Sequence, residues 1–266
     1  MRLVFCGSPA PSARVLEAII DAGHEVCLVV TAPDRRRGRG SATSPTPVAS
    51  VAAAHSLPIS HDVDDVVNVG ADLGIVVAFG RLIPTRVLDA VPMVNVHYSL
   101  LPRWRGAAPV ERAILAGDDH TGVCLMEVVP ELDAGGVYAS TSVPVGERTA
   151  AELLVDLTEA GIALVLDALA TGLGDPVAQE GEVTYAHKMT PQDRRIDWSA
   201  PAEVIARVVR VGAAWTTWRG ERVGVVAGEI TAGGYVPTVV RPSGRGDMAA
   251  ADFWRGARAD DGEWFE

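Results

Sequence analysis

A short run near the middle of the chain, from Asn95 to Gly106, combines residue types suited to chemistry on a carbonyl group. Asn95 and His97 stand two positions apart in a strand-like segment, so in an extended chain their side chains share a face. Val94 and Val96 then point to the opposite, core face. An amide and an imidazole side by side at a strand end, next to a basic loop, indicate a site that acts on a carbonyl group.

One carboxylate is a candidate partner for this pair. Asp133 lies in a loop that follows a strand-like segment and turns on Gly135 and Gly136. Such a loop can return a carboxylate to the strand ends of a parallel sheet, where α/β sites form. Taken singly, both residue types have plainer interpretations: a strand histidine is commonly structural, and an aspartate before two glycines is a typical turn residue. On these residues alone, the structural and the functional interpretations both stay open.

Composition and charge limit the classes of protein to which the chain can belong. The 266 residues carry a net charge of −11, which argues against a broadly basic nucleic-acid surface. The local exception is a segment with four arginines in five positions, which is either a solvated loop or a patch for a polyanion. No apolar run approaches the ~18 residues of a membrane span, and the first residues read as a strand instead of a signal peptide. The arginines of the exceptional segment are Arg35, Arg36, Arg37 and Arg39.

The three cysteines are too few and too irregular for a disulfide framework or a zinc site. They lie in apolar strand-like runs, so we expect buried, reduced thiols in a cytoplasmic protein. Gly7-Ser8-Pro9 supplies a single glycine after the first strand, which makes a dinucleotide-binding loop a weak interpretation. No metal site is expected.

Strand-like and helix-like segments alternate through the first part of the chain. The strands are apolar on both faces, which is typical of a parallel sheet covered on both sides. The fold class predicted is therefore α/β, with a Rossmann-like, mainly parallel sheet, helices on both faces and a small β-rich C-terminal domain. Expected strands include Arg2–Cys6, Glu25–Thr31, Leu73–Ala78, Met93–His97, Gly122–Val129 and Val137–Val145, and expected helices include Ala13–Ala22, Pro47–His55, Pro84–Ala90, Pro109–Ala116 and Thr149–Leu173.

The composition of the sequence changes near residue 174. Pro, Gly and polar residues lead to a helix-like segment at Ala202–Val211, and short β-like pieces punctuated by glycine follow it. We predict a catalytic domain over residues 1–175, a linker over 176–198 and a β-rich domain over 199–266.

The motifs together resemble those of the formyltransferases that use 10-formyltetrahydrofolate. The resemblance rests on Asn95-x-His97, on Ser99-Leu100-Leu101-Pro102-x-x-Arg105-Gly106 and on Leu132-Asp133-Ala134-Gly135. Within that superfamily the chain looks most like the methionyl-tRNA formyltransferases, through stretches such as Val76–Gly80 and Ile196-Asp197-Trp198-Ser199. The match spans nearly the whole chain.

The resemblance implies a role for each motif residue. Asn95 is expected to donate a hydrogen bond to the oxyanion that forms on the formyl oxygen, and His97 to donate as well or to shuttle a proton. Asp133 would orient the imidazole, and no metal is required. The formyl donor, 10-formyltetrahydrofolate, is expected to contact Phe79, Gly80, Leu82, Ser99, Leu100, Leu101 and Pro102.

The acceptor implied by the resemblance is the amine of methionyl-initiator tRNA. The arginine-rich segment 35–39 and Arg105 are expected near the tRNA or the acceptor, although Arg105 could serve as a loop anchor instead. The segment between Val226 and Arg241 is shorter than is usual in the family. Two alternatives therefore stay open: formylation of a small amine, such as a nucleotide-linked amino sugar, and a non-catalytic folate- or nucleotide-binding module.

Overall fold

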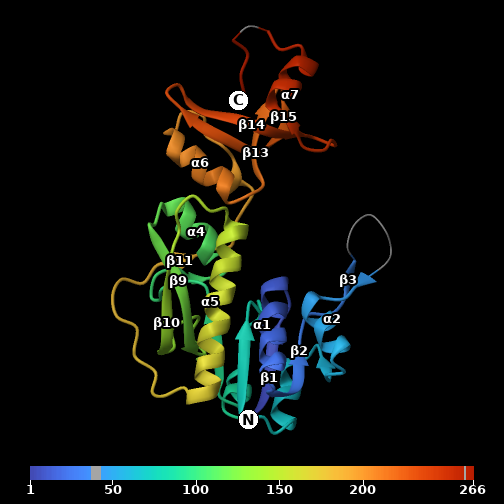
Figure 1. Ribbon diagram of the computed structural model, residues 1–266, viewed down its shortest axis with the longest axis vertical. Coiled ribbons are helices and arrows are strands. Elements are labelled where there is room, and N and C mark those ends of the chain that lie inside the picture. The colour runs from blue at the N-terminus through green and yellow to red at the C-terminus, as the bar shows by residue number, and fades with distance from the viewer. Residues whose placement is uncertain (37–42, 261) are drawn as a thin grey trace. The chain divides into compact units, whose positions relative to one another are not determined.

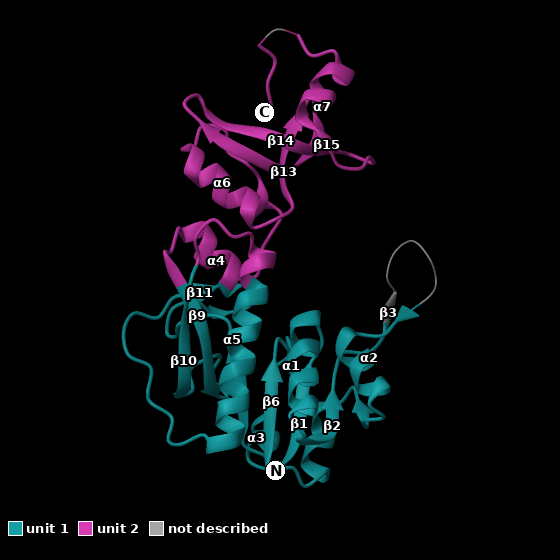
Figure 2. Cartoon of the chain, viewed as in Figure 1, with its two compact units in different colours: residues 1–109, 121–144, 154–186 teal, residues 110–120, 145–153, 187–266 magenta. Residues whose placement is uncertain are grey.

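The computed structural model describes residues 1–36, 43–260 and 262–266, with no account of the side chains of Arg35 and Arg36. The chain divides into two compact units (Figure 2). The first comprises residues 1–109, 121–144 and 154–186, and the second comprises 110–120, 145–153 and 187–266. The change from the first unit to the last segment of the second falls after Ala186, inside the region predicted as a linker.

The first unit is built on a seven-stranded sheet in the order β10-β9-β7-β6-β1-β2-β5. Strands β5, β2, β1, β6 and β7 pair in parallel, and β9 runs antiparallel to β7. This mainly parallel sheet confirms the predicted α/β class. The strands are β1 (Arg2–Gly7), β2 (Glu25–Val30), β5 (Ile59–Ser60), β6 (Leu73–Val77), β7 (Met93–His97), β9 (His120–Glu127) and β10 (Val137–Pro144).

Helices α1 and α5 run alongside the strands (Figure 1). Helix α1 buries an apolar stripe that includes Val15, Leu16 and Ile19, and Thr46 caps α2 by accepting a hydrogen bond from the Ala49 N–H. Two short pieces, the 3-10 helix Val63–Asn68 and the paired strands β8 (Arg105–Gly106) and β11 (Tyr185–Ala186), have no counterpart in the predicted elements. The α-helices are α1 (Ala10–Asp21), α2 (Pro47–Ala54), α3 (Thr85–Leu88), α4 (Pro109–Ala116) and α5 (Ala150–Thr171).

The arginine-rich segment begins as a strand. Residues Arg35–Arg36 form β3, which pairs antiparallel with β4 (Thr43–Ser44). Arg37 and Arg39 lie outside the described residues, so the proposed polyanion contact of this segment stays a prediction.

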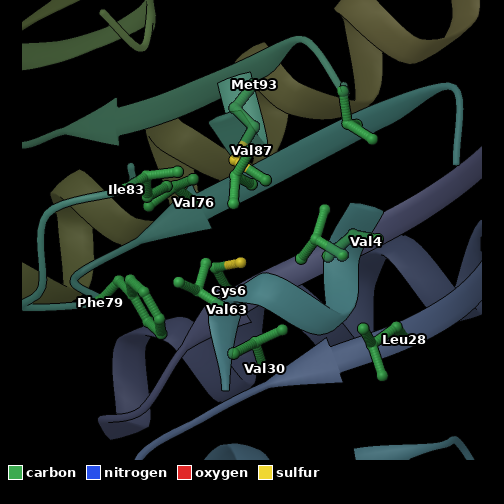
Figure 3. Packing of buried hydrophobic residues seen from close by; sticks show 12 residues of the cluster. Val4, Cys6, Leu28, Val30, Val63, Val76, Phe79, Ile83, Val87 and Met93 are labelled. Carbon is green, nitrogen blue, oxygen red and sulfur yellow. The ribbon is translucent and has the colours of Figure 1, made fainter. Parts of the chain in front are cut away.

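An apolar cluster packs against strands β1, β2, β6 and β7. Figure 3 shows Val4 and Cys6 of β1 packed in one cluster with Phe79 and Met93, among others. Burial raises the pKa of the Cys6 thiol to about 12, so this sulfur stays protonated and inert. Cys6 and Cys124 are buried as predicted, Cys27 is partly exposed, and all three are free.

This core is expected to be sensitive to cavity formation. Met93 is 2% exposed at the start of β7, whereas Val155 on α5 is 61% exposed. Replacement of Met93 by alanine is expected to lower the free energy of unfolding by about 2–5 kcal/mol, measured by chemical denaturation. The matched control Val155→Ala is expected to change it by less than about 0.5 kcal/mol. Equal effects of the two substitutions would contradict this description of the core.

The second unit contains a four-stranded antiparallel sheet in the order β12-β13-β14-β15. The region between Val226 and Arg241, short in the sequence, is a continuous hairpin in which two residues join β13 to β14. Two apolar clusters hold this unit together, one under α6 and one under α7. Its elements are the 3-10 helix Gln192–Arg194, α6 (Ala202–Arg210), β12 (Ala214–Trp218), β13 (Glu221–Thr231), β14 (Gly234–Pro242), β15 (Met248–Ala249) and α7 (Ala250–Ala257).

The β-rich character of this unit agrees with the sequence prediction, whereas helix α7 was not among the predicted elements. Across the described residues, no helix has both the length and the apolar character needed to pass through a bilayer.

Candidate active site

The end of strand β7 presents its polar residues on one face. Asn95 is half-buried and His97 is buried, and the intervening Val96 packs on the other side, where Gly161 of α5 leaves room for it. The side chain of Tyr98 also points toward α5, where its hydroxyl accepts a hydrogen bond of 3.4 Å from Thr158. The strand alternation predicted from the sequence therefore places the amide and the imidazole together.

Asn95, His97 and Asp133 line one cavity of about 450 Å³. A cavity of this size suits a small-molecule ligand, and its walls are largely apolar. The non-catalytic alternative predicts that these three side chains diverge, and the structure instead brings them to one space. Other lining residues are Val76, Ala78, Phe79, Gly80, Arg81, Leu82, Ile83, Val96, Tyr98, Gly106, Ala107, Pro109, Met126, Val128, Val129, Pro130 and Leu132.

His97 lies between two acceptor oxygens. Its Nε2 lies 2.9 Å from the carbonyl oxygen of Trp104, and its Nδ1 lies 3.7 Å from Oδ2 of Asp133. A carbonyl oxygen only accepts, so we assign the proton of the neutral ring to Nε2. Nδ1 is then the nitrogen with a lone pair, and a proton taken up there meets the Asp133 carboxylate.

Asp133 occupies a constrained position. Its φ of +49° lies in the left-handed region, which aspartate tolerates better than most residues. The Gly106 N–H donates a 2.8 Å hydrogen bond to its Oδ2 and fixes the carboxylate. Gly135 lets the loop close against β9, because a Cβ there would lie 2.1 Å from the Glu127 carbonyl oxygen. Gly135, one of the two glycines that mark the turn in the sequence, thus allows the close approach to β9 in the loop that carries Asp133.

Asn95 offers a donor to the cavity. Among the described residues its side-chain amide has no hydrogen-bond partner, and the residue borders the cavity next to His97. A half-buried amide without a protein partner is a group that a ligand oxygen can satisfy.

The residues predicted to contact the folate divide into two groups. Phe79, Gly80 and Leu82 line the cavity, and Leu82 is 74% exposed at its edge. The segment Ser99–Pro102 is not among the lining residues. Ser99 is fully buried, and its hydroxyl donates a 2.6 Å hydrogen bond to the Arg103 carbonyl, so this segment shapes the loop that carries Trp104. Folate contact stays a prediction for both groups.

Arg105 is buried, with 8% of its surface exposed. Its guanidinium donates to Oε1 of Gln179 at 3.1 and 2.7 Å and lies 3.8 Å from Glu131. This placement supports the loop-anchor alternative raised from the sequence, and an acceptor contact of Arg105 is left as an untested prediction.

Several groups that build the site were missed in the sequence. The Trp104 carbonyl and the Gly106 N–H act through the backbone, which leaves no signal in side-chain patterns. Thr184 and Gln179 act through side chains, but they lie in an irregular segment without strand or helix periodicity. Gln179 is half-buried between exposed neighbours, a feature that only the structure reveals.

The chain matches family models over most of its length. A model described as formyl transferase matches residues 1–168, and one described as formyl transferase, C-terminal domain, matches residues 188–237. The methionyl-tRNA formyltransferase of Roseobacter denitrificans is 38% identical over 302 residues, an alignment that covers 100% of this chain and 99% of that relative.

Solved structures show the same fold. The methionyl-tRNA formyltransferase of Clostridium thermocellum superposes with a TM-score of 0.66 at 16% identity, covering 92% of this chain and 100% of that one. HypX of Aquifex aeolicus, crystallised with tetrahydrofolic acid, superposes with a TM-score of 0.70 at 22% identity. That alignment covers 96% of this chain and 47% of HypX, so this chain spans about half of the larger protein.

Proposed function

We propose a function from one premise: the chain belongs to the formyl transferase family. It transfers a formyl group from 10-formyltetrahydrofolate to the amine of methionyl-tRNA. The similarity to a methionyl-tRNA formyltransferase extends over the full length of both chains, tail included. The observation that carries the chemistry is the convergence of Asn95, His97 and Asp133 on one cavity.

The reaction makes and breaks one carbon–nitrogen bond. The acceptor amine attacks the formyl carbon, negative charge grows on the formyl oxygen, and the bond from that carbon to the folate nitrogen breaks. The amine loses a proton and the departing folate nitrogen gains one, so the site needs an oxyanion donor and a group that moves a proton.

Asn95 fits the first requirement. Its amide is unsatisfied among the described residues and borders the cavity, so an N–H is available to the formyl oxygen as charge develops. A preorganised donor of this kind is typically worth about 3–4 kcal/mol in the transition state.

His97 fits the second requirement. The Trp104 carbonyl holds Nε2–H, which leaves the lone pair at Nδ1 to accept the proton of the attacking amine. The Asp133 carboxylate at 3.7 Å stabilises the imidazolium that results. The same Nδ1 proton can then pass to the departing nitrogen. No covalent intermediate on the protein is needed.

The cavity is where the folate donor is expected to bind. Its walls are largely apolar and include Leu82, and its volume of about 450 Å³ lies in the range of small-molecule sites. The finer assignment, that the acceptor is the initiator form of methionyl-tRNA, follows from the family resemblance and is part of the proposal.

An acceptor panel tests this function. Purified protein with 10-formyltetrahydrofolate labelled in the formyl group is offered methionyl-initiator tRNA, methionyl-elongator tRNA, free methionine and a nucleotide-linked amino sugar. Label is expected on the methionyl amine, with the initiator tRNA preferred. Transfer to the amino sugar alone would replace this acceptor by the small-amine alternative, and transfer to none of them would contradict formyl transfer to these amines.

The arginine-rich segment is expected to contribute to tRNA binding. Each lysine or arginine that neutralises a phosphate steepens the fall of affinity with salt, by about 0.7 to 0.9 in logarithmic slope. Replacing Arg35, Arg36, Arg37 and Arg39 by glutamine should raise the KM for tRNA and flatten its dependence on salt. An unchanged slope, with KM for the folate donor also unchanged, would remove the segment from the tRNA site.

A further inference from the structure

Gln179 lies outside the catalytic cavity and joins the two loops that hold its proton-transfer pair. It belongs to the segment that returns from the end of α5 past β10 to β11 (Figure 1). Val177 in this segment exchanges backbone hydrogen bonds with Val137 at the start of β10. Gln179 is half-buried, whereas the residues on both sides of it, Ala178 and Glu180, are exposed.

The amide of Gln179 is fully used. Its Nε2 donates to the carbonyl oxygens of Asp133 and Gly135, at 2.8 Å each. Its Oε1 accepts the two hydrogen bonds from Arg105. Donors thus face carbonyls and the acceptor faces a cation, which fixes the orientation of the amide group. The uncharged side chain of Gln179 therefore binds the backbone of the Asp133 loop and the guanidinium of Arg105, which lies in the loop from Trp104 to Gly106.

Both loops matter to His97. The Trp104 carbonyl receives the Nε2–H, and the Gly106 N–H fixes the Asp133 carboxylate near Nδ1. Asp133 sits at a positive φ, a backbone state that persists only when its surroundings hold it. Gln179 captures the carbonyl of this residue and of the residue two positions on, so it resists relaxation of the strained turn.

We propose that Gln179 is a positioning residue for formyl transfer, which keeps the Asp133 carboxylate at its distance from Nδ1 of His97. This inference rests on the proposed function, since its effect is exerted on the proton-transfer pair. The Nε2 donors to the two carbonyls are the essential contacts. The Arg105 contact orients the amide that makes them.

Three variants separate this role from simple packing. Gln179→Ala removes all four hydrogen bonds. Gln179→Glu keeps an acceptor for Arg105 but turns carboxylate oxygens toward the two carbonyls, so the donors are lost. Glu180→Ala changes the exposed neighbour and is the matched control. Thermal unfolding of each variant reports whether the fold is intact.

We expect Gln179→Ala and Gln179→Glu to lower kcat for formyl transfer by about 10- to 100-fold, because small misplacements of reacting groups have effects of this size. The KM values for the folate donor and for methionyl-tRNA should stay within about twofold, since Gln179 is not among the residues that line the cavity. Glu180→Ala should match the wild type. In an Asp133→Ala background, Gln179→Ala should have no further effect on kcat.

The ring nitrogen resonances of His97, followed by NMR, supply a readout besides activity. They should shift in Gln179→Ala and not in Glu180→Ala. The proposal would be overturned by wild-type kcat in folded Gln179→Ala, by an undiminished loss in the Asp133→Ala background, or by unshifted His97 resonances. An inactive wild type would count against the proposed function instead. The His97 ring resonances would then still show whether Gln179 holds Asp133 at its distance from the imidazole.

Discussion

Replacement of His97 by alanine is expected to lower kcat for formyl transfer at least about a hundredfold, the usual contribution of a positioned proton-transfer group. The imidazole is the group in the cavity whose Nδ1 can accept a proton while its Nε2 is fixed by the Trp104 carbonyl. Without it, the attacking amine loses the imidazole that accepts its proton. The measurement is steady-state transfer of labelled formyl to methionyl-tRNA.

An exposed histidine provides the matched control. His55 follows helix α2 and is exposed, so His55→Ala should retain wild-type turnover. The KM values of His97→Ala are expected to change little, because the loss falls on a proton transfer. Turnover of folded His97→Ala within threefold of the wild type would contradict the role assigned to this residue.

Replacement of Asn95 by aspartate is expected to lower kcat by about 100- to 1000-fold, the range found when an oxyanion donor is removed. Aspartate keeps the shape of the side chain and exchanges its N–H donors for an acceptor of negative charge. It therefore opposes the charge that develops on the formyl oxygen. Asn95→Ala should show only the part of the loss that comes from the missing donor, and the difference between the two variants then measures the effect of the added charge.

The control for this change is Asn68→Asp, at the exposed end of the 3-10 helix over residues 63–68. It alters the net charge by the same amount at a residue that does not line the cavity, and it should leave kcat unchanged. A folded Asn95→Asp or Asn95→Ala variant with normal kcat would show that another donor stabilises the oxyanion.

The sequence predicted the elements whose side chains follow a clear period. Strands such as β1 and β6 are apolar on both faces, and the pattern of α1 follows one helical face. Helix α7 was missed because it spans only eight residues, contains Gly256 and mixes polar with aromatic residues, so no helical period stands out. The β8–β11 pair was also missed, since two residues on each side give no pattern.

The residues of the candidate site likewise fall into those that the sequence could predict and those that it could not. Asn95 and His97 could be paired from strand alternation, whereas Asp133 was a candidate from its glycine-rich turn and became a site residue through the family resemblance. The backbone groups of Trp104 and Gly106 could not be predicted, because any residue type carries them. The inward turn of Arg105 also needed the structure, since a basic loop residue is more often solvated than buried.

A single turnover with excess protein tests the proposed formyl transfer and the roles of His97 and Asn95 together. Protein with 10-formyltetrahydrofolate labelled in the formyl group is mixed with methionyl-initiator tRNA, and the label on the methionyl amine is followed in time. We expect full transfer by the wild type in one exponential phase, and transfer at least about a hundredfold slower by folded His97→Ala and Asn95→Asp. Wild-type rates in both variants would rule out the roles assigned to these two residues, and no label on the methionyl amine with the wild type would rule out the proposed function.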